Sequence, residues 1–282
     1  MTKILVTGCN GQLGRAINKV YSGNTSFELI NTDVADLDIT AIDKVVDFVQ
    51  ANKPDVIINC AAYTAVDASE ADEDNAFRIN AIGPRNLSIA AQKIGSKIMH
   101  ISTDYVFDGE SRKPYREMDT VNPQGAYGRT KLAGEQMVAQ FSDRFYIVRT
   151  AWLYGDGKNF AKTMLRLAES NDSVRVVADQ FGTPTSADEL AKAIAFLVST
   201  DNYGIFHGTC EGSCCWADFT EEIFRLKGLS TKVNRITTQE YPTPAKRPAY
   251  SVLDNYMLNI TSDYRFADWH EAIKEYLEDY NG

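Results

Sequence analysis

The chain contains 282 residues, of which 44% are hydrophobic, and its formal net charge is -9 at pH 7. A chain of this size can bury one large core, or one core and a smaller lobe. It holds no run of about 18 apolar residues that could span a membrane. Nucleic acid and anionic membranes would repel its acidic surface, which excludes both as general partners. Five cysteines, an odd number, and an N-terminus without a signal-peptide pattern lead us to expect a cytoplasmic protein.

Strand-like apolar runs alternate with amphipathic helical patterns from the N-terminus to about residue 179. The runs are KILVTG, FELINTD, DVIINCA, KIMHIST, FYIVRTAW and VRVVAD. Such alternation predicts βαβ units, and therefore an α/β fold whose doubly wound, Rossmann-like parallel sheet has helices on both faces. From about residue 153 the alternation loosens, and the segment 239–254 contains three of the eight prolines. We expect this later part to form a smaller C-terminal lobe over the carboxyl edge of the sheet.

A glycine-rich turn, TGCNGQLG, follows the first predicted strand and precedes a helical pattern. Gly8, Gly11 and Gly14 permit a tight turn and a close approach of the backbone to a pyrophosphate. The helix that follows would direct free N–H groups and its positive dipole end at the anion. We therefore predict a dinucleotide-binding domain over residues 1–152, to which some later segments return. Residues 153–282 are assigned mainly to a substrate-binding lobe.

Asp33 ends the second predicted strand, about 20 residues beyond the glycine turn, where a carboxylate can accept hydrogen bonds from the adenosine ribose. This placement favours NAD. Asp36 and Asp38 are rival contacts, and Asp33 can equally be a turn residue. Arg15, just past the turn, could instead meet the 2′-phosphate of NADP. The residues thus predict a nicotinamide cofactor, NADPH or NADH, and leave the preference open.

Small and polar residues follow the third and fourth strands, where the carboxyl edge of a parallel sheet opens into a ligand crevice. In NCAAYTAVDASE, Ala61 and Ala62 would let a cofactor ring lie close. In ISTDYVFDGE, the hydroxyl of Thr103 could donate to a substrate oxygen or satisfy a nearby backbone group. Asn80 lies within a later helical pattern, where its amide could bridge backbone and cofactor or simply face solvent.

Tyr127 and Lys131 stand four positions apart in YGRTKLAGEQ, so on a helix they project to the same side, with β-carbons about 5 to 6 Å apart. A buried ammonium favours the phenolate of a neighbouring phenol. We therefore expect the pKa of Tyr127 to fall from about 10 toward working pH, which would make it a general acid or base. The spacing is common by chance, but here a dinucleotide turn and Thr103 precede it.

These motifs resemble the extended short-chain dehydrogenases/reductases, and within them the dTDP-4-dehydrorhamnose reductases. The resemblance covers nearly the whole chain through GxxGQLG, DLDIT, NCAAYTAVDxxE, ISTDYVFDG, YGRTKxxGE, RTAWLYG and KRPAYSVLD. It implies a catalytic triad of Thr103, Tyr127 and Lys131. The cofactor contacts that it implies are Gly8, Asn10, Gly11, Gln12, Leu13, Leu37, Asp38, Ala61, Ala62, Asn80, Tyr127 and Lys131. The substrate contacts that it implies are Val66, Thr103, Asp104, Tyr105, Tyr127 and Trp152.

The reaction implied by this resemblance is the NADPH- or NADH-dependent reduction of the 4-keto group of dTDP-4-dehydro-L-rhamnose to dTDP-L-rhamnose. Tyr127 would protonate the developing alkoxide, and Thr103 would hydrogen-bond the same oxygen. Lys131 would lower the tyrosine pKa and hold the nicotinamide ribose. Two alternatives stay open. One is a reductase of another nucleotide-4-keto-sugar, and the other is a non-catalytic, dinucleotide-binding regulatory subunit.

The basic segment AKRPAYSVLD is predicted to hold the diphosphate, because an acidic chain needs a local cation to bind a dianion. Arg247 is the first candidate and Lys246 its rival, while an exposed loop paired with surface carboxylates is the alternative reading. The cysteines of TCEGSCCW match no common zinc spacing, so no metal site is predicted. A homodimer is a further expectation, because some members of the resembling family assemble as dimers.

Overall fold

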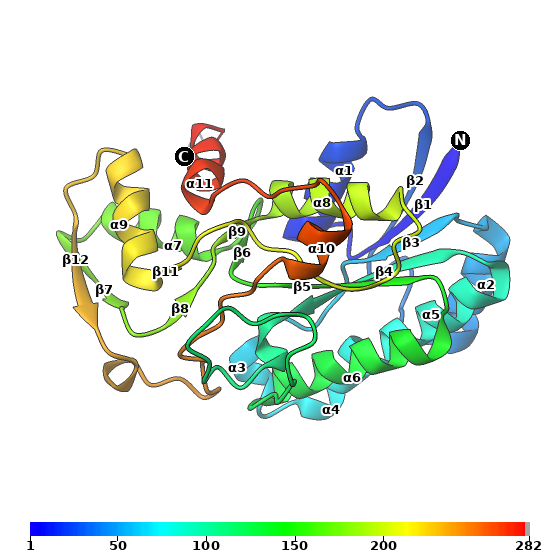
Figure 1. Cartoon of the computed structure of the whole chain (residues 1–282), viewed down its shortest axis with the longest axis horizontal. Coiled ribbons are helices and arrows are strands. Elements are labelled where there is room, and N and C mark those ends of the chain that lie inside the picture. The colour runs from blue at the N-terminus through cyan, green and yellow to red at the C-terminus, as the bar shows by residue number, and fades with distance from the viewer. Residues whose placement is uncertain (280–282) are drawn as a thin grey trace.

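A computed structural model describes residues 1–279 of the chain. Its larger part is built on a six-stranded parallel sheet with the strand order β10-β5-β4-β3-β1-β2 (Figure 1). The strands are β1 (Thr2–Thr7), β2 (Phe27–Thr32), β3 (Val56–Asn59), β4 (Lys97–Thr103), β5 (Phe145–Thr150) and β10 (Gly204–His207). The winding direction reverses between β1 and β3, the kind of point at which open α/β sheets bind ligands. The predicted doubly wound α/β fold is confirmed.

Helices cover both faces of this sheet (Figure 1). One face carries α1 (Gln12–Tyr21), α8 (Ala187–Val198) and α10 (Tyr256–Thr261). The other carries α2 (Ile42–Asn52), α5 (Gly83–Ile94) and α6 (Ala126–Phe141).

Successive residues of β1 divide between the two cores. Ile4 and Val6 pack toward α1 and α8, whereas Leu5 packs toward α2 and α5. Side chains of a strand alternate between the two faces, and here both faces are apolar. Burial on both sides explains why the strands read as continuous apolar runs in the sequence.

A smaller lobe lies beside the sheet and has its own apolar core (Figure 1). Its helices are α7 (Phe160–Ala168), α9 (Trp216–Leu226) and α11 (Trp269–Glu278). Its short strands pair as β7 (Ser173–Val177) with β12 (Lys232–Ile236), and β8 (Phe181–Gly182) with β11 (Cys214–Cys215). The pair β6 (Leu153–Tyr154) and β9 (Thr185–Ser186) leads from the sheet into the lobe.

Short helical turns connect the main elements, mostly at the carboxyl edge of the sheet. They are α3 (Val66–Ser69), α4 (Glu73–Phe77), the π-helical turn η1 (Arg78–Ile82), and the 3-10 turns η2 (Asp104–Val106) and η3 (Thr238–Glu240). None of the helices within residues 1–279 is long and apolar enough to cross a membrane.

One predicted strand lies outside the main sheet. The run VRVVAD forms β7, which pairs with β12 in the lobe. The sixth strand of the sheet is instead β10, which pairs with β5. The four residues of β10, of which the first is a glycine, give too short a pattern to stand out in the sequence, whereas β7 has the length and β-branched content of a sheet strand.

Candidate active site

A cavity of about 800 Å³ opens at the carboxyl ends of β1, β3, β4 and β5. Most of the residues predicted to bind cofactor or substrate line it. They are Gly8, Gly11, Gln12, Leu13, Asp33, Leu37, Asp38, Ala61, Ala62, Val66, Thr103, Asp104, Tyr105, Tyr127, Lys131 and Trp152. Three predicted residues, Asn10, Asn80 and Arg247, are not part of this lining.

The glycine turn forms one end of the cavity and leaves no room for side chains. Gly8 has a φ of 65°, and a β-carbon there would lie 2.7 Å from the backbone nitrogen of Ala61. A β-carbon at Gly14 would overlap the backbone of Gly8 and Cys9. Gly11 caps the start of α1 without a side-chain hydrogen bond, so the first N–H groups of the helix are free to meet an anion. The turn therefore fits a pyrophosphate.

The two acidic candidates for the adenosine ribose both line the cavity and are both engaged with the backbone. Asp33 accepts hydrogen bonds from the N–H groups of Asn10 (3.3 Å) and Val34 (2.8 Å). Asp38 accepts from the hydroxyl (2.7 Å) and the N–H (2.9 Å) of Thr40, and these bonds hold its pKa below the usual value.

The remaining polar candidates near the glycine turn lie elsewhere. Asp36 accepts a hydrogen bond from the N–H of Asp33 and does not line the cavity. Arg15, the sequence candidate for a 2′-phosphate, is paired with Asp156 at 3.1 Å and lines a separate pocket between α1 and the lobe. Asn10 donates its N–H to Asp33 and is exposed.

The three candidate catalytic groups meet at the other end of the cavity. Tyr127 and Lys131 lie on the first turns of α6, and Thr103 is the last residue of β4. The Lys131 ammonium donates to the carbonyl of Ile101 at 2.5 Å. Burial lowers the pKa of Lys131 to about 8, an effect that the carboxylate of Glu135 opposes. Thr103 donates its hydroxyl to Asp104 at 2.9 Å.

The expected fall of the Tyr127 pKa is wrong for this structure. Burial raises the pKa of Tyr127 above its usual value, the Asp104 carboxylate adds to the rise, and the Thr103 hydroxyl opposes it. Loss of solvation disfavours a phenolate, and the Lys131 ammonium is directed at a backbone carbonyl. Burial likewise raises the pKa of Asp104, to about 6. Tyr127 therefore holds its proton at neutral pH.

Asn80 joins backbone segments, and its side chain does not reach the cavity. It is fully buried in η1, where its amide oxygen accepts from the N–H of Tyr63 at 2.8 Å. Its amide nitrogen donates to the Tyr63 carbonyl and to the Thr130 hydroxyl, both at 3.1 Å. A β-carbon at Gly134 would overlap the Asn80 carbonyl oxygen, so α6 packs directly on this turn. The Asn80 amide thus anchors α6, and the cofactor contact expected of Asn80 stays a prediction.

Arg247 lies beside the cavity and is half-buried. Its Nη2 donates to Asp67 at 2.7 Å, and its Nη1 lies 3.4 Å from the hydroxyl of Tyr105, which does line the cavity. Lys246 is exposed. Arg247 thus brings the segment that follows β12 to the edge of the cavity. Its guanidinium already forms an ion pair with the Asp67 carboxylate.

The sequence analysis expected Trp152 at the substrate, but it missed the side chains that support the site from behind, which are Trp216 and a buried polar cluster. Trp152 has a φ of 48°, unusual for a large side chain, and its indole stacks on that of Trp216 at 3.5 Å between ring centres. Ser102, Glu135 and Arg149 form a buried polar cluster below the catalytic groups. The position of Glu135, four residues after Lys131, was the one available signal for that cluster.

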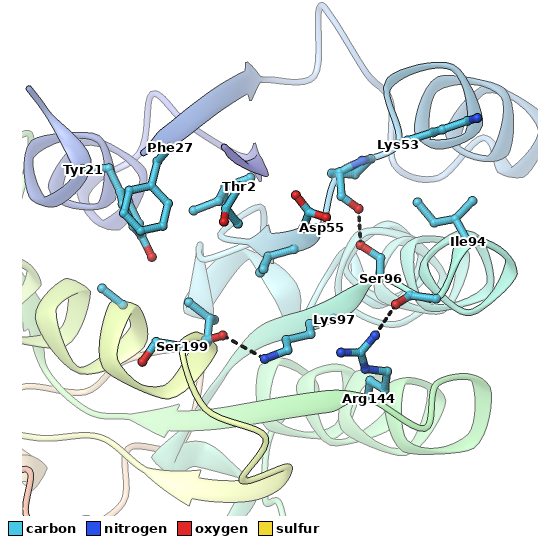
Figure 2. A pocket seen from close by; sticks show the side chains of 16 residues that line it. Thr2, Tyr21, Phe27, Lys53, Asp55, Ile94, Ser96, Lys97, Arg144 and Ser199 are labelled. Atoms are coloured by element: carbon cyan, nitrogen blue, oxygen red, sulfur yellow. Dashed lines mark hydrogen bonds between the residues drawn. The ribbon is translucent and has the colours of Figure 1, made fainter. Parts of the chain in front are cut away.

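A second cavity, of about 820 Å³, lies at the opposite edge of the sheet, where β1, β3 and β4 begin (Figure 2). Two of its cations, the partly buried Lys97 and the exposed Arg144, serve the fold. Lys97 donates to the carbonyl of Val198, the last residue of α8, and Arg144 donates to the carbonyl of Gly95 after α5 (Figure 2). Lys97 also donates to the carbonyl of Thr200, two residues beyond α8. Cations at helix C-termini are stabilising there. These contacts explain the charged lining without a ligand.

No group of three or more His, Cys, Asp or Glu side chains within residues 1–279 is arranged to hold a metal ion. All five cysteines are free thiols.

A sheet with this switch point, and a glycine turn at its carboxyl edge, are the features of a Rossmann-like, dinucleotide-binding fold. Comparison with known proteins is more specific. The family model of the RmlD substrate binding domain matches residues 1–281, and the chain belongs to that family.

Individual relatives can be aligned with this chain over almost their full length. A dTDP-4-dehydrorhamnose reductase of Aggregatibacter actinomycetemcomitans is 41% identical, with 97% of this chain and 98% of the relative covered. The crystal structure of a dTDP-4-dehydrorhamnose reductase from Clostridium acetobutylicum has a TM-score of 0.97 at 55% identity, covering 98% and 99% of the two chains. That of Bacillus anthracis, in complex with NADP, has a TM-score of 0.96 at 39% identity, covering 99% and 100%. The resemblance to this family of reductases is confirmed.

Proposed function

We propose that this protein is a dTDP-4-dehydrorhamnose reductase, which reduces the 4-keto group of dTDP-4-dehydro-L-rhamnose to dTDP-L-rhamnose with NADPH or NADH. One observation carries the proposal. A single cavity has a pyrophosphate-binding turn at one end and Thr103, Tyr127 and Lys131 at the other. The names of the relatives supply the nucleotide sugar, and the NADP in the Bacillus anthracis enzyme supports the cofactor.

The cofactor would lie across the switch point of the sheet. Gly8, Gly11 and the start of α1 would hold its pyrophosphate, while Asp33 and Asp38 would face the adenosine ribose. Ala61 and Ala62 leave space for the dinucleotide after β3, and Lys131 would hold the nicotinamide ribose. When bound, the reduced nicotinamide supplies the hydride for the keto carbon.

Side chains of the protein would supply the proton that the reduction needs. Tyr127 keeps its phenolic proton at neutral pH because burial disfavours the phenolate, which is the state that a general acid requires in a reduction. It would donate this proton to the carbonyl oxygen of the sugar, and the Thr103 hydroxyl would turn from Asp104 to the same oxygen. The Lys131 ammonium would stabilise the phenolate that is left.

The sugar would lie against the residues that line the remaining wall of the cavity, Val66, Asp104, Tyr105 and Trp152. Arg247 would move from Asp67 to the diphosphate, which offers a dianion in place of one carboxylate. Residues 153–282, from which Leu153 lines the cavity and Arg247 lies beside it, are proposed mainly as the substrate-binding lobe. We also propose a cytoplasmic location, supported by the free thiols, and a homodimer, which light scattering would test.

Consumption of NADPH and of NADH, followed by absorbance with dTDP-4-dehydrorhamnose, tests the proposal. A UDP- or GDP-4-keto-sugar serves as the matched comparison, and the product is identified by mass and by its sugar configuration. Turnover restricted to a UDP- or GDP-sugar would favour the alternative nucleotide-sugar reductase. Tight binding of NADPH without turnover of any keto-sugar would favour a regulatory subunit and refute the reductase.

A further inference from the structure

Glu135 is a third side chain on the face of α6 that presents Tyr127 and Lys131. It follows Lys131 by four positions, and 3% of it is exposed. Its carboxylate accepts from Arg149 twice, from Nε at 2.9 Å and from Nη2 at 2.7 Å, and from the Ser102 hydroxyl at 2.5 Å. Glu135 therefore joins α6, β4 and β5 inside the protein.

The partners of Glu135 are Ser102, next to the candidate catalytic threonine on β4, and Arg149 on the neighbouring strand β5. Ser102 lies between Thr103 and Ile101, whose carbonyl accepts from Lys131. Ser102 is also paired in register with Arg149 on β5. Arg149, 3% exposed, donates its Nη1 to a backbone carbonyl at 3.1 Å, which leaves it little freedom to move. The bonds of Glu135 therefore fix this strand end relative to α6.

A buried ion pair is a weak source of stability, because desolvation of both charges offsets their attraction. Its place below the catalytic groups indicates another role. Lys131 is buried, and burial opposes its charge, while the Glu135 carboxylate and the Cys60 thiol favour that charge. Burial lowers the pKa of His100 on β4, the Lys131 ammonium lowers it further, and neither His100 nor Tyr127 on α6 is an anion at neutral pH.

We propose that Glu135 is a positioning residue of the site, which through Ser102 and Arg149 holds Thr103 against the helix of Tyr127 and Lys131 and gives the Lys131 ammonium a buried counter-charge. The hydrogen bonds of Glu135 are present whatever the substrate is. Their effect on catalysis rests on the proposed reductase function. The two halves of the proposal, charge and position, are tested by different variants.

The charge is tested by titrating Lys131 in the full chain, by NMR of carbon-labelled lysine, with the Lys131 signal assigned by its loss in Lys131→Met. Glu135→Gln removes the counter-charge, so the midpoint of Lys131 should fall by at least about half a pH unit. Glu189→Gln is the matched control, because Glu189 is a buried carboxylate on α8 paired with Lys192. A folded Glu135→Gln protein with the wild-type midpoint would overturn the proposal.

Glu135→Gln leaves Arg149 without a counter-charge and can fail to fold for that reason alone. The double variant Glu135→Gln/Arg149→Met removes both buried charges, so no charge is left uncompensated. Its Lys131 midpoint should fall as well, because the carboxylate that favours the ammonium is gone. If Lys131 titrates in the double variant with the wild-type midpoint, the role of Glu135 as its counter-charge is refuted as well.

The position is tested by kinetics of Ser102→Ala, which keeps the charge of Glu135 and removes one of its three hydrogen bonds. We expect kcat to fall about three- to tenfold, with unchanged NADPH affinity and an unchanged Lys131 midpoint. Ser88→Ala is the control, since Ser88 is a fully buried hydroxyl on α5 bonded to a backbone carbonyl. Equal kcat values in Ser102→Ala and Ser88→Ala would refute the positioning role. If the wild type reduces no keto-sugar, the reductase proposal fails, and the Lys131 titration still decides the role of Glu135.

Discussion

Arg247 and Asp67, 180 positions apart in the chain, form an ion pair with an Nη2–Oδ2 distance of 2.7 Å. The other carboxylate oxygen of Asp67 accepts from the N–H of Ala245 at 3.2 Å. One side chain on α3 therefore ties the basic segment 245–254 to the rim of the cavity. A diphosphate that binds Arg247 must compete with Asp67.

Arg247→Ala should raise the KM for the dTDP-sugar strongly and leave the KM for the cofactor nearly unchanged. The loss in kcat/KM should be about 1.5 to 3 kcal/mol, the range for a charge-assisted hydrogen bond. Lys246→Ala is the matched control, because Lys246 is exposed and one position away. Steady-state kinetics with each substrate varied in turn makes the measurement. A sugar KM that stays at the wild-type value would exclude the diphosphate contact.

Tyr127→Phe should keep its affinity for NADPH and lower turnover by at least about 100-fold, the scale of losing a general acid. The phenol is the group with a proton to give, since burial keeps it protonated at neutral pH. Tyr105→Phe is a suitable comparison, because Tyr105 is adjacent, with 5.5 Å between the centres of its ring and that of Tyr127. Near-normal turnover in folded Tyr127→Phe would remove Tyr127 from the mechanism.

Asp33→Ala should weaken the binding of NADH more than that of NADPH, because a carboxylate at this point favours a free 2′-hydroxyl and repels a 2′-phosphate. Dissociation constants for both cofactors, from fluorescence titration, make the comparison. The bonds from Asn10 and Val34 offer the opposing explanation, that Asp33 shapes its own turn. Equal effects on the two cofactors would support that explanation.

The value of kcat/KM should decline as the pH rises through about 8, the pKa to which burial lowers Lys131. The direction of this pH dependence follows from the charge of Lys131. The proposed role needs the ammonium, which is complete below this pKa and lost above it. Tyr127 contributes no alkaline loss in this range, because its own pKa is raised. A pH profile measured with wild type and Lys131→Arg tests this, since an arginine stays charged and should move the decline to higher pH. A wild-type profile that stays flat through pH 8 would be inconsistent with the role of Lys131.

The sequence predicted the parts of the fold and site that depend on local pattern. Apolar runs identified five of the six sheet strands, and the spacing of Gly8, Gly11 and Gly14 located the tight turn that precedes α1. Tyr127 and Lys131 lie on one helix, so their approach follows from helix geometry alone.

The features that the sequence did not predict depend on burial and on contacts between distant segments. The pKa of Tyr127 rises because the assembled site excludes water, and no local spacing reports this. The amide of Asn80 is used up by Tyr63 and Thr130, which come from other elements. Arg247 meets Asp67 only after the chain has folded back across the sheet.

The stack of Trp152 on Trp216 has a mechanical consequence. Trp152 follows β5 of the sheet, but its indole packs against the core of the lobe, and a β-carbon at Gly182 would overlap that indole. A rotation of the lobe relative to the sheet must therefore move the ring that lines the cavity. The width of the cavity at Trp152 and the tilt of the lobe therefore change together. A sugar that binds against Trp152, as proposed, would favour the lobe orientation that keeps this stack.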